Sequence, residues 1–213
     1  MKSTQKIYKR NEVVFFRKTK EEYGGLSNMA AGFPIELNGA RILSSEALYQ
    51  AMRFPNHPNY QKEIIQQKSP MTAKMISKKY RPHTREDWED VRIMIMRWCL
   101  RVKLIQNWDK FGSLLLSTLD KQIVEESNKD DFWGARPSDM NLLVGTNALG
   151  RLLMELRAEL TKFIGKKELS SPHIDNFMLY GKEIGNIGFE NKTMPIESLS
   201  NTNSNFENLS LFD

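Results

Sequence analysis

The feature that most constrains the fold is a long helical pattern between residues 84 and 106. Its apolar residues recur at spacings of three and four, which places them on one continuous face of a helix; they are Trp88, Val91, Ile95, Trp98, Val102 and Ile105. Residues 84–87 read Thr-Arg-Glu-Asp, similar to a capping box with Asp87 in place of the usual Glu. The pattern therefore predicts a helix that opens at Thr84, ends near Gln106 and buries one face in a core.

Other segments suggest a helical core with little sheet. The run 13–16 is β-prone, and 33–43 reads as a hairpin because Asn38-Gly39 separates two apolar stretches. Further helices are expected at 44–54, 60–67, 70–79, 109–119 and 147–164. We predict an α+β fold, mostly α-helical, with a small antiparallel sheet or hairpin.

The chain divides into three parts by pattern. Residues 1–12 read as a loose N-terminal arm, 13–165 as the folded domain, and 166–213 as a polar C-terminal tail, partly disordered or lightly docked, because periodicity is lost after Gly165. No apolar run approaches the roughly 18 residues that span a membrane, and the polar N-terminus lacks a secretory pattern. Together with the single Cys99, read as a core residue, these features predict a cytoplasmic protein without a membrane partner.

Net charge is +5, which permits attraction to phosphates, although 26 acidic residues are interspersed with the basic ones. The densest basic stretch is 74–85. A solvated face and a phosphate-facing surface explain it about equally well.

Residues 44–54 predict a short helix capped by Ser44 or Ser45. Glu46 falls in its first turn, where the helix dipole favours a carboxylate. Taken alone, Glu46 reads as an ordinary helix-start acid.

Two polar loops surround this helix in the sequence. The first holds Gly24-Gly25, which permits close approach of a ligand, together with the hydrogen-bonding residues Ser27 and Asn28. The second, 125–147, concentrates polar groups and an aromatic residue between two helices, as binding loops do; it includes Asp130, Trp133, Gly134 and Asn147. Three separated histidines and one cysteine do not make a usual zinc site, and no phosphate-binding or dinucleotide motif occurs, so we expect neither a metal nor a cofactor.

Four blocks of the chain, in this order, resemble the NADAR domain family. They are Tyr-Gly-Gly-Leu-Ser-Asn-Met at 23–29, Ser-Glu-Ala-Leu-Tyr-Gln-Ala-Met-Arg-Phe at 45–54, Asp-Asp-Phe-Trp-Gly at 130–134, and Gly-Thr-Asn-Ala-Leu-Gly at 145–150 followed by Leu-Met-Glu-Leu-Arg at 153–157. The resemblance covers about 15–160. It departs from many members at Leu48-Tyr49, where they have Tyr-Phe.

The resemblance implies roles for individual residues. It places the family's catalytic glutamate on Glu46, its acidic residue three before a tryptophan on Asp130 with Trp133 as partner, and a further tryptophan on Trp88. The sugar-capturing lysine proposed for some members matches Lys74. Arg53 and Lys78 are alternatives for the charge roles.

The resemblance also implies hydrolysis of an N-glycosidic bond to ribose. In one branch the substrate is ADP-ribose on guanine in nucleic acid, and the protein is the antitoxin of a DNA-modifying ADP-ribosyltransferase. In another it is a phosphorylated riboflavin intermediate. The first block is more similar to the nucleic-acid branch, which makes ADP-ribose or ADP-ribosylated nucleic acid the expected ligand and a cognate toxin the expected partner. A non-catalytic ADP-ribose-binding module is a further alternative.

Overall fold

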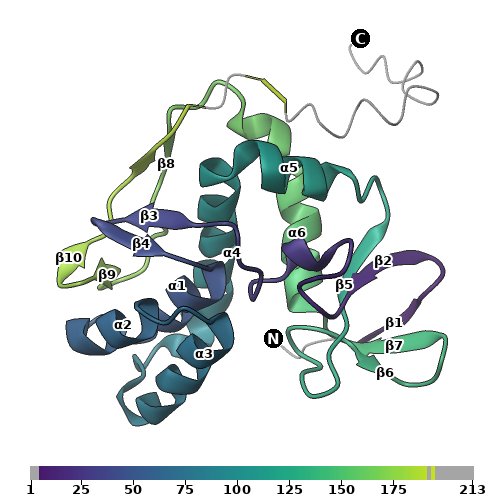
Figure 1. The fold of residues 1–213 in the computed structure, drawn as a ribbon, viewed down its shortest axis with the longest axis horizontal. Helices are drawn as coiled ribbons and strands as arrows, with labels where there is room; N and C mark the ends of the chain where they lie inside the picture. The colour runs from purple at the N-terminus through teal and green to yellow at the C-terminus, as the bar shows by residue number, and fades with distance from the viewer. Residues whose placement is uncertain (1–4, 191–192, 195–213) are drawn as a thin grey trace.

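Helix α4, Trp88–Gln106, runs through the middle of the molecule and packs against helices and a hairpin on several sides. This computed structural model describes residues 5–190, 193 and 194. In Figure 1, helices α1–α3 lie on one side of α4 and strands β1, β2 and β5–β7 lie on the other. The predicted apolar face is confirmed, because all six residues of the stripe are buried.

The predicted start of α4 is wrong. Residues Arg81–His83 form a separate 3₁₀ turn, and α4 begins at Trp88. The side chain of Arg85 donates two hydrogen bonds to the Asp87 carboxylate, at 2.5 and 2.9 Å. That pairing occupies the carboxylate that the capping box required.

The other helices agree with the pattern to within a few residues. Helices α1 (Ser45–Ala51), α2 (Pro58–Ile65) and α3 (Pro70–Lys79) pack on one another. Helices α5 (Trp108–Leu116) and α6 (Ala148–Ala158) pack beside α4, and α6 continues as a 3₁₀ turn over Leu160–Phe163.

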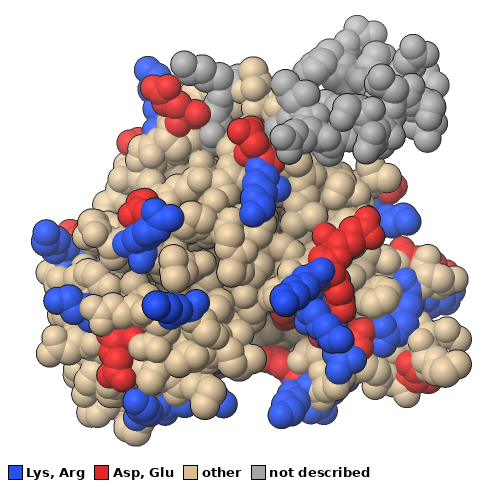
Figure 2. Space-filling view, viewed as in Figure 1, with Lys and Arg blue, Asp and Glu red and all other residues tan. Residues whose placement is uncertain are grey.

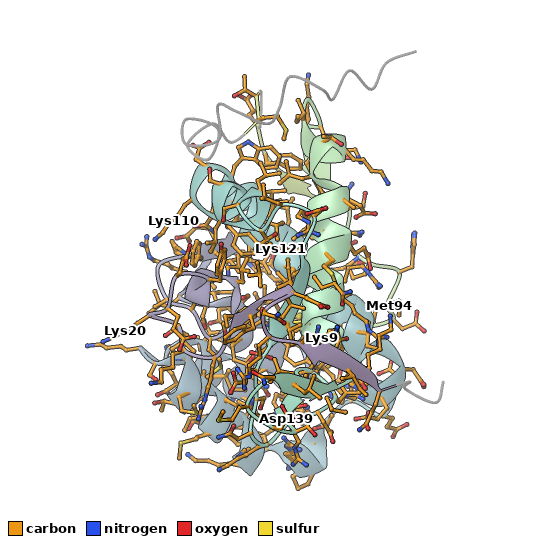
Figure 3. The ribbon with its side chains drawn as sticks, turned by 90° about the vertical axis from the view of Figure 1, so that its right-hand side faces the viewer. Lys9, Lys20, Met94, Lys110, Lys121 and Asp139 are labelled. Carbon is orange, nitrogen blue, oxygen red and sulfur yellow. The ribbon has the colours of Figure 1, made fainter. Side chains whose placement is uncertain are left out.

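The strands form several small sheets. Strands β1 (Lys6–Lys9), β7 (Leu142–Gly145) and β6 (Arg136–Pro137) are antiparallel in the order β1-β7-β6. Strand β2 (Val13–Phe16) pairs in parallel with β5 (Gln122–Glu125), although the sequence suggested only antiparallel pairing. Turned by 90° (Figure 3), the strand side faces the viewer, with Lys9 of β1 above Asp139 of the β6–β7 turn. The fold is α+β and mostly helical, as predicted.

The predicted hairpin is present. Strands β3 (Ile35–Leu37) and β4 (Ala40–Ile42) pair antiparallel across Asn38 and Gly39. Both turn residues have positive φ, 49° and 77°, the conformation that an Asn-Gly turn supplies at low steric cost.

Two segments depart from the expected loose ends. Part of the arm forms β1, and Tyr8 is buried there. Residues 166–190 form the strand pairs β8 (Glu168–Leu169) with β11 (Ile187–Gly188) and β9 (Met178–Leu179) with β10 (Lys182–Glu183). Apolar residues of that segment join the main core: Leu169, Ile174, Phe177, Leu179 and Ile184. They are irregularly spaced, and only Leu169 and Leu179 lie in strands, each of two residues, so the sequence has no period to detect. The predictions for residues 1–4, 191–192 and 195–213 lie outside the described residues.

In the described part of the chain, no helix combines the length and the apolar character needed to cross a membrane.

Candidate active site

A cavity of about 260 Å³ lies where α1 and α3 face the end of β5 and the loop that follows it. Its charged lining consists of the acids Glu46, Glu125, Glu126 and Asp130 and the bases Arg17, Arg53, Lys74 and Arg81. On the face drawn in Figure 2, the surface is hollowed between the helical and strand sides, with acidic atoms inside and basic side chains beside it. A larger cleft of about 490 Å³ beside α4 contains none of the predicted site residues.

Glu46 is held at the start of α1, and its side chain is nearly buried, with the residue 5% exposed. Ser44 caps the helix, since its Oγ accepts a hydrogen bond from Ala47 N–H at 3.2 Å. Glu46 N–H donates to the carbonyl of Asn28 at 3.1 Å, which ties the helix start to the first polar loop. The sequence-predicted pair of Glu46 and Asn28 thus meets at the cavity.

Two polar side chains orient the Glu46 carboxylate. Gln50 Nε2 donates to Glu46 Oε1 at 2.9 Å, and Ser77 Oγ donates to Gln50 Oε1 at 2.6 Å. Because the serine holds the amide oxygen, the amide NH₂ faces the carboxylate. Glu46 therefore acts as an acceptor, the role of an ionised carboxylate.

Lys74 reaches the same carboxylate from α3. Its Nζ lies 3.9 Å from Glu46 Oε1, and its side chain is 43% exposed, so the amine also faces solvent at the cavity. The structure brings together Glu46 and Lys74, two of the three residues that the resemblance assigned to chemistry; the third is Asp130.

Asp130 and Trp133 also line the cavity, but one oxygen of Asp130 serves the loop itself. Asp130 Oδ1 accepts hydrogen bonds from Phe132 N–H at 3.0 Å and Trp133 N–H at 2.8 Å. This turn sets the Trp133 ring against Tyr49, edge to face, with centroids 5.7 Å apart. Oδ1 of Asp130 thus positions Trp133, and the catalytic role that the sequence assigned to Asp130, which lines the cavity, stays a prediction.

Trp88, which the resemblance places among the ligand-binding residues, is not among the residues that line the cavity. Only 4% of Trp88 is exposed. Its ring packs against Tyr49, and the Arg53 guanidinium lies 4.1 Å from its centroid. Burial lowers the pKa of Arg53. Trp88 therefore supports Arg53, which does line the cavity.

Four further predicted ligand-binding residues lie behind the cavity wall. The carbonyl of Gly25 accepts from Lys103, and Ser27 Oγ accepts from Met29 N–H. The Asn147 amide bridges Glu125 N–H and the carbonyl of Ile123. A Cβ on Gly134 would lie 2.4 Å from the Glu125 carbonyl, so glycine is needed there for backbone packing. These residues shape the loops and do not line the cavity.

Glu125 is the site residue that the sequence analysis missed. It ends β5 and lines the cavity. Its pKa is raised to about 7, chiefly by burial and also by the neighbouring carboxylates of Glu46 and Asp130, while Lys74 acts in the opposite direction. Its neighbour Glu126 is instead paired with Arg10 at 2.6 Å and Arg17 at 3.7 Å. The available signal was two acids placed directly after a buried strand.

Arg17 and Arg81 were also missed as site residues, since each stands outside the four blocks. Both line the cavity. Among residues 5–190, 193 and 194, no three His, Cys, Asp or Glu side chains are grouped closely enough to hold a metal ion.

Comparisons with known proteins show which family the chain resembles. Residues 14–161 match the family model described as the NADAR domain. N-glycosidase YbiA of Escherichia coli K12 is 36% identical over 148 residues, 70% of this chain and 88% of YbiA. Riboflavin biosynthesis protein VVA0006 of Vibrio vulnificus is 35% identical over 149 residues, 69% of this chain and 38% of that protein. The NMR structure of E. coli YbiA superposes with a TM-score of 0.61 at 35% identity, covering 70% of this chain and 85% of that one.

Proposed function

This chain belongs to the NADAR domain family, and from that premise we propose that it is an N-glycosidase that removes ADP-ribose from guanine bases of DNA. The observation that carries the proposal is the pair of Glu46 and Lys74 in a cavity with both acidic and basic walls. In this role the protein is the antitoxin of an ADP-ribosyltransferase that modifies DNA.

The carboxylate suits the reaction. When the bond from ribose C1′ to the base nitrogen breaks, the electron pair leaves with the base and positive charge develops on the sugar. An ionised Glu46, fixed by Gln50, stabilises that charge or orients the attacking water. Lys74 offers a second route, since an amine can capture the aldehyde of the opened sugar as a Schiff base.

The basic lining suits a pyrophosphate. Arg17, Arg53 and Arg81 come from three separate segments and line one cavity with Lys74. Arginine forms bidentate hydrogen bonds with phosphate oxygens, so the set offers more than one cation for each of two phosphates. Trp133, half-buried at the wall, offers an aromatic edge or face to a base.

A second candidate substrate is a phosphorylated ribosylaminopyrimidine of riboflavin biosynthesis. Two observations favour it. Relatives carry the names N-glycosidase YbiA and riboflavin biosynthesis protein, and a cavity of about 260 Å³ is at the small end of the range for ligand pockets. For the ADP-ribosyl substrate, the cavity holds the reacting ribose and a neighbouring group while the remainder lies along the basic surface.

The test is incubation of the protein with an oligonucleotide carrying one ADP-ribosylated guanine, followed by mass analysis of the sugar and the DNA. We expect free ADP-ribose and unmodified DNA, and a much slower reaction with Glu46→Gln. If the protein hydrolyses the riboflavin intermediate and leaves the modified DNA intact, the second candidate replaces the first. If it binds ADP-ribose tightly and cleaves neither substrate, the protein is a binding module.

A further inference from the structure

The backbone of Glu125 is held by hydrogen bonds and by strand pairing. Its N–H donates to Asn147 Oδ1 at 3.1 Å, and its carbonyl accepts from Ala135 N–H at 2.8 Å. The parallel ladder pairs it with Phe16 of β2. These three contacts hold the backbone in place and therefore set the position from which the Glu125 side chain extends at the cavity.

The charges around Glu125 differ from those around the other acids of the cavity. Glu46 has an amide donor and an ammonium group beside its carboxylate. Glu126 has two guanidinium partners. The groups that act most on Glu125 are the two carboxylates of Glu46 and Asp130, opposed by the ammonium of Lys74.

This asymmetry decides which carboxyl group keeps a proton. Two carboxylates in one cavity disfavour each other's ionisation, and the better solvated or better paired one ionises first. Glu46 is the better paired, from α1 and α3. Of the remaining cavity cations, Arg17 follows β2 and lies 3.7 Å from Glu126, while Arg53 packs on Trp88; within the described part of the chain neither forms an ion pair with Glu125. Arg81 also lines the cavity.

We propose that Glu125 is the general acid of this site and donates its carboxyl proton to the departing base. As the C1′–N bond breaks, its electron pair goes to the base nitrogen, and that nitrogen takes the proton from Glu125. Water then adds its oxygen to C1′ and returns one proton to the Glu125 carboxylate. The products are the sugar with a C1′ hydroxyl and the base with an N–H where the sugar was attached, and the acid is regenerated.

The need for such a group follows from the leaving group. A nitrogen anion is a poor leaving group at neutral pH, and a positioned acid contributes typically about 10²–10⁴-fold to such a step. Division of labour between one ionised and one protonated carboxyl group is the pattern of glycoside hydrolases. The inference rests on the proposed N-glycosidase function and holds for either candidate substrate.

The kinetic test compares Glu125→Gln with wild type between pH 5.5 and 9, on whichever of the two substrates wild type hydrolyses. We expect the wild-type rate to fall above about pH 7 as Glu125 loses its proton. The variant should be slower by about 10²-fold or more and lose this alkaline limb. Glu168→Gln, an exposed acid of β8, is the matched control and should keep the wild-type profile. A Glu125→Gln enzyme within threefold of wild type, or with the same alkaline limb, overturns the proposal.

A second measurement needs no turnover. The side-chain carboxyl signal of Glu125, assigned by its loss in Glu125→Gln, is followed by ¹³C NMR against pH in folded wild type. A midpoint near 7 supports the proposal, and Glu46→Gln should lower it because a neighbouring negative charge is removed. A midpoint below 5 overturns it even if the enzyme is active. A wild type that cleaves neither substrate overturns the proposed function, an outcome visible without any Glu125 variant.

Discussion

At the scale of single residues, Glu46 is the group on which the proposed chemistry depends. Glu46→Gln keeps the shape of the side chain and removes its charge. We expect turnover to fall by about 10²-fold or more, as for loss of a general acid–base or charge-stabilising group. Because the side chain is nearly buried and its neighbour Gln50 presents an NH₂, thermal unfolding should be compared in parallel. Near-normal turnover by the folded variant would remove Glu46 from the reaction.

Lys74 yields a prediction about covalent chemistry. If it captures the opened ribose, borohydride added during turnover should reduce the Schiff base and leave the sugar attached to this lysine. Peptide mapping should find the adduct on Lys74, which lies 3.9 Å from Glu46, and no adduct on the exposed Lys78 of the same helix. An adduct on another lysine contradicts this assignment. Absence of any adduct points to direct attack by water.

Site residues could be predicted from the sequence where a family motif and a local structural signal fall on the same residue. Glu46 was found because a helix start and a motif coincide there. Asn147 was assigned to ligand binding because it lies in a polar loop between two helices, the kind of segment that often binds ligands. Its actual partners, at Ile123 and Glu125, come from a strand far back in the chain. Glu125 could not be ranked above Glu126, because only the folded structure shows which of the two is paired with arginine.

At the scale of elements, the loop before α1 is held by a lysine inside the core. Lys103 of α4 is fully buried, and its Nζ donates to the carbonyls of Gly25 at 2.6 Å and Ser27 at 3.1 Å. The rings of Phe33 and Phe111 have their centroids 4.4 and 4.2 Å from the same Nζ atom. Burial holds the pKa of Lys103 well below its usual value.

Lys103→Met should destabilise the protein by about 1–3 kcal/mol, because it leaves two buried carbonyls without a donor. The effect depends on pH. A lysine whose pKa is lowered by folding takes up a proton more readily when unfolded, so wild-type stability rises with pH below about 10.4, the unfolded pKa. The difference between wild type and variant, measured by urea unfolding, should therefore grow from pH 7 to pH 9.

The matched control is Lys110→Met. Lys110 lies 4.7 Å from the same Phe33 ring and donates to the carbonyl of Gly32, but it is exposed. Its replacement should change stability by less than about 0.5 kcal/mol at pH 7. If both variants lose the same stability, the burial of Lys103 does not explain its contribution to stability.

Elements with a complete local signal were predicted well. The α4 stripe and the Asn38-Gly39 hairpin are each determined by residues that lie close together in the sequence. The start of α4 was misplaced because Thr84-Arg85-Glu86-Asp87 satisfies the capping pattern while Arg85 competes for Asp87. The parallel pairing of β2 with β5 was not predicted, because the sequence of a strand does not show which distant strand it pairs with.

At the scale of the whole molecule, residues 166–190 are part of the core. A chain that ends at Gly165 loses five buried apolar side chains, each worth up to about 1.5–3 kcal/mol of burial before entropy is subtracted. We expect it to be insoluble or to unfold many degrees lower. A chain that ends at Met194 keeps these contacts and is the control. Equal melting temperatures of the two chains would show that the segment adds nothing.

The proposed DNA substrate predicts a salt effect. Each phosphate contacted by a lysine or arginine releases counterions, so binding of ADP-ribosylated DNA should weaken steeply with salt, and binding of free ADP-ribose much less. Lys78 and Lys79 are exposed on α3, next to the cavity residue Lys74. Replacing both by alanine should reduce the log–log slope for DNA by about 1–2. Cleavage of a small ADP-ribosyl-guanosine should stay within twofold. Unchanged DNA slopes would identify these lysines as a solvated face.

The pairing of Val13 with Gln122 affects how the protein folds during synthesis. One wall of the cavity is made by 17–53 and the facing wall by 125–133, and the parallel ladder is what joins them. Pairing between such distant segments must close a long loop before the strand contacts can form. The entropy cost of that closure slows folding. During synthesis the first half of the chain emerges with Glu46 and no opposite wall. Activity should therefore appear late on the ribosome, after β5 has paired with β2 and residues 166–190 have completed the core, and a chain halted before residue 122 should be inert.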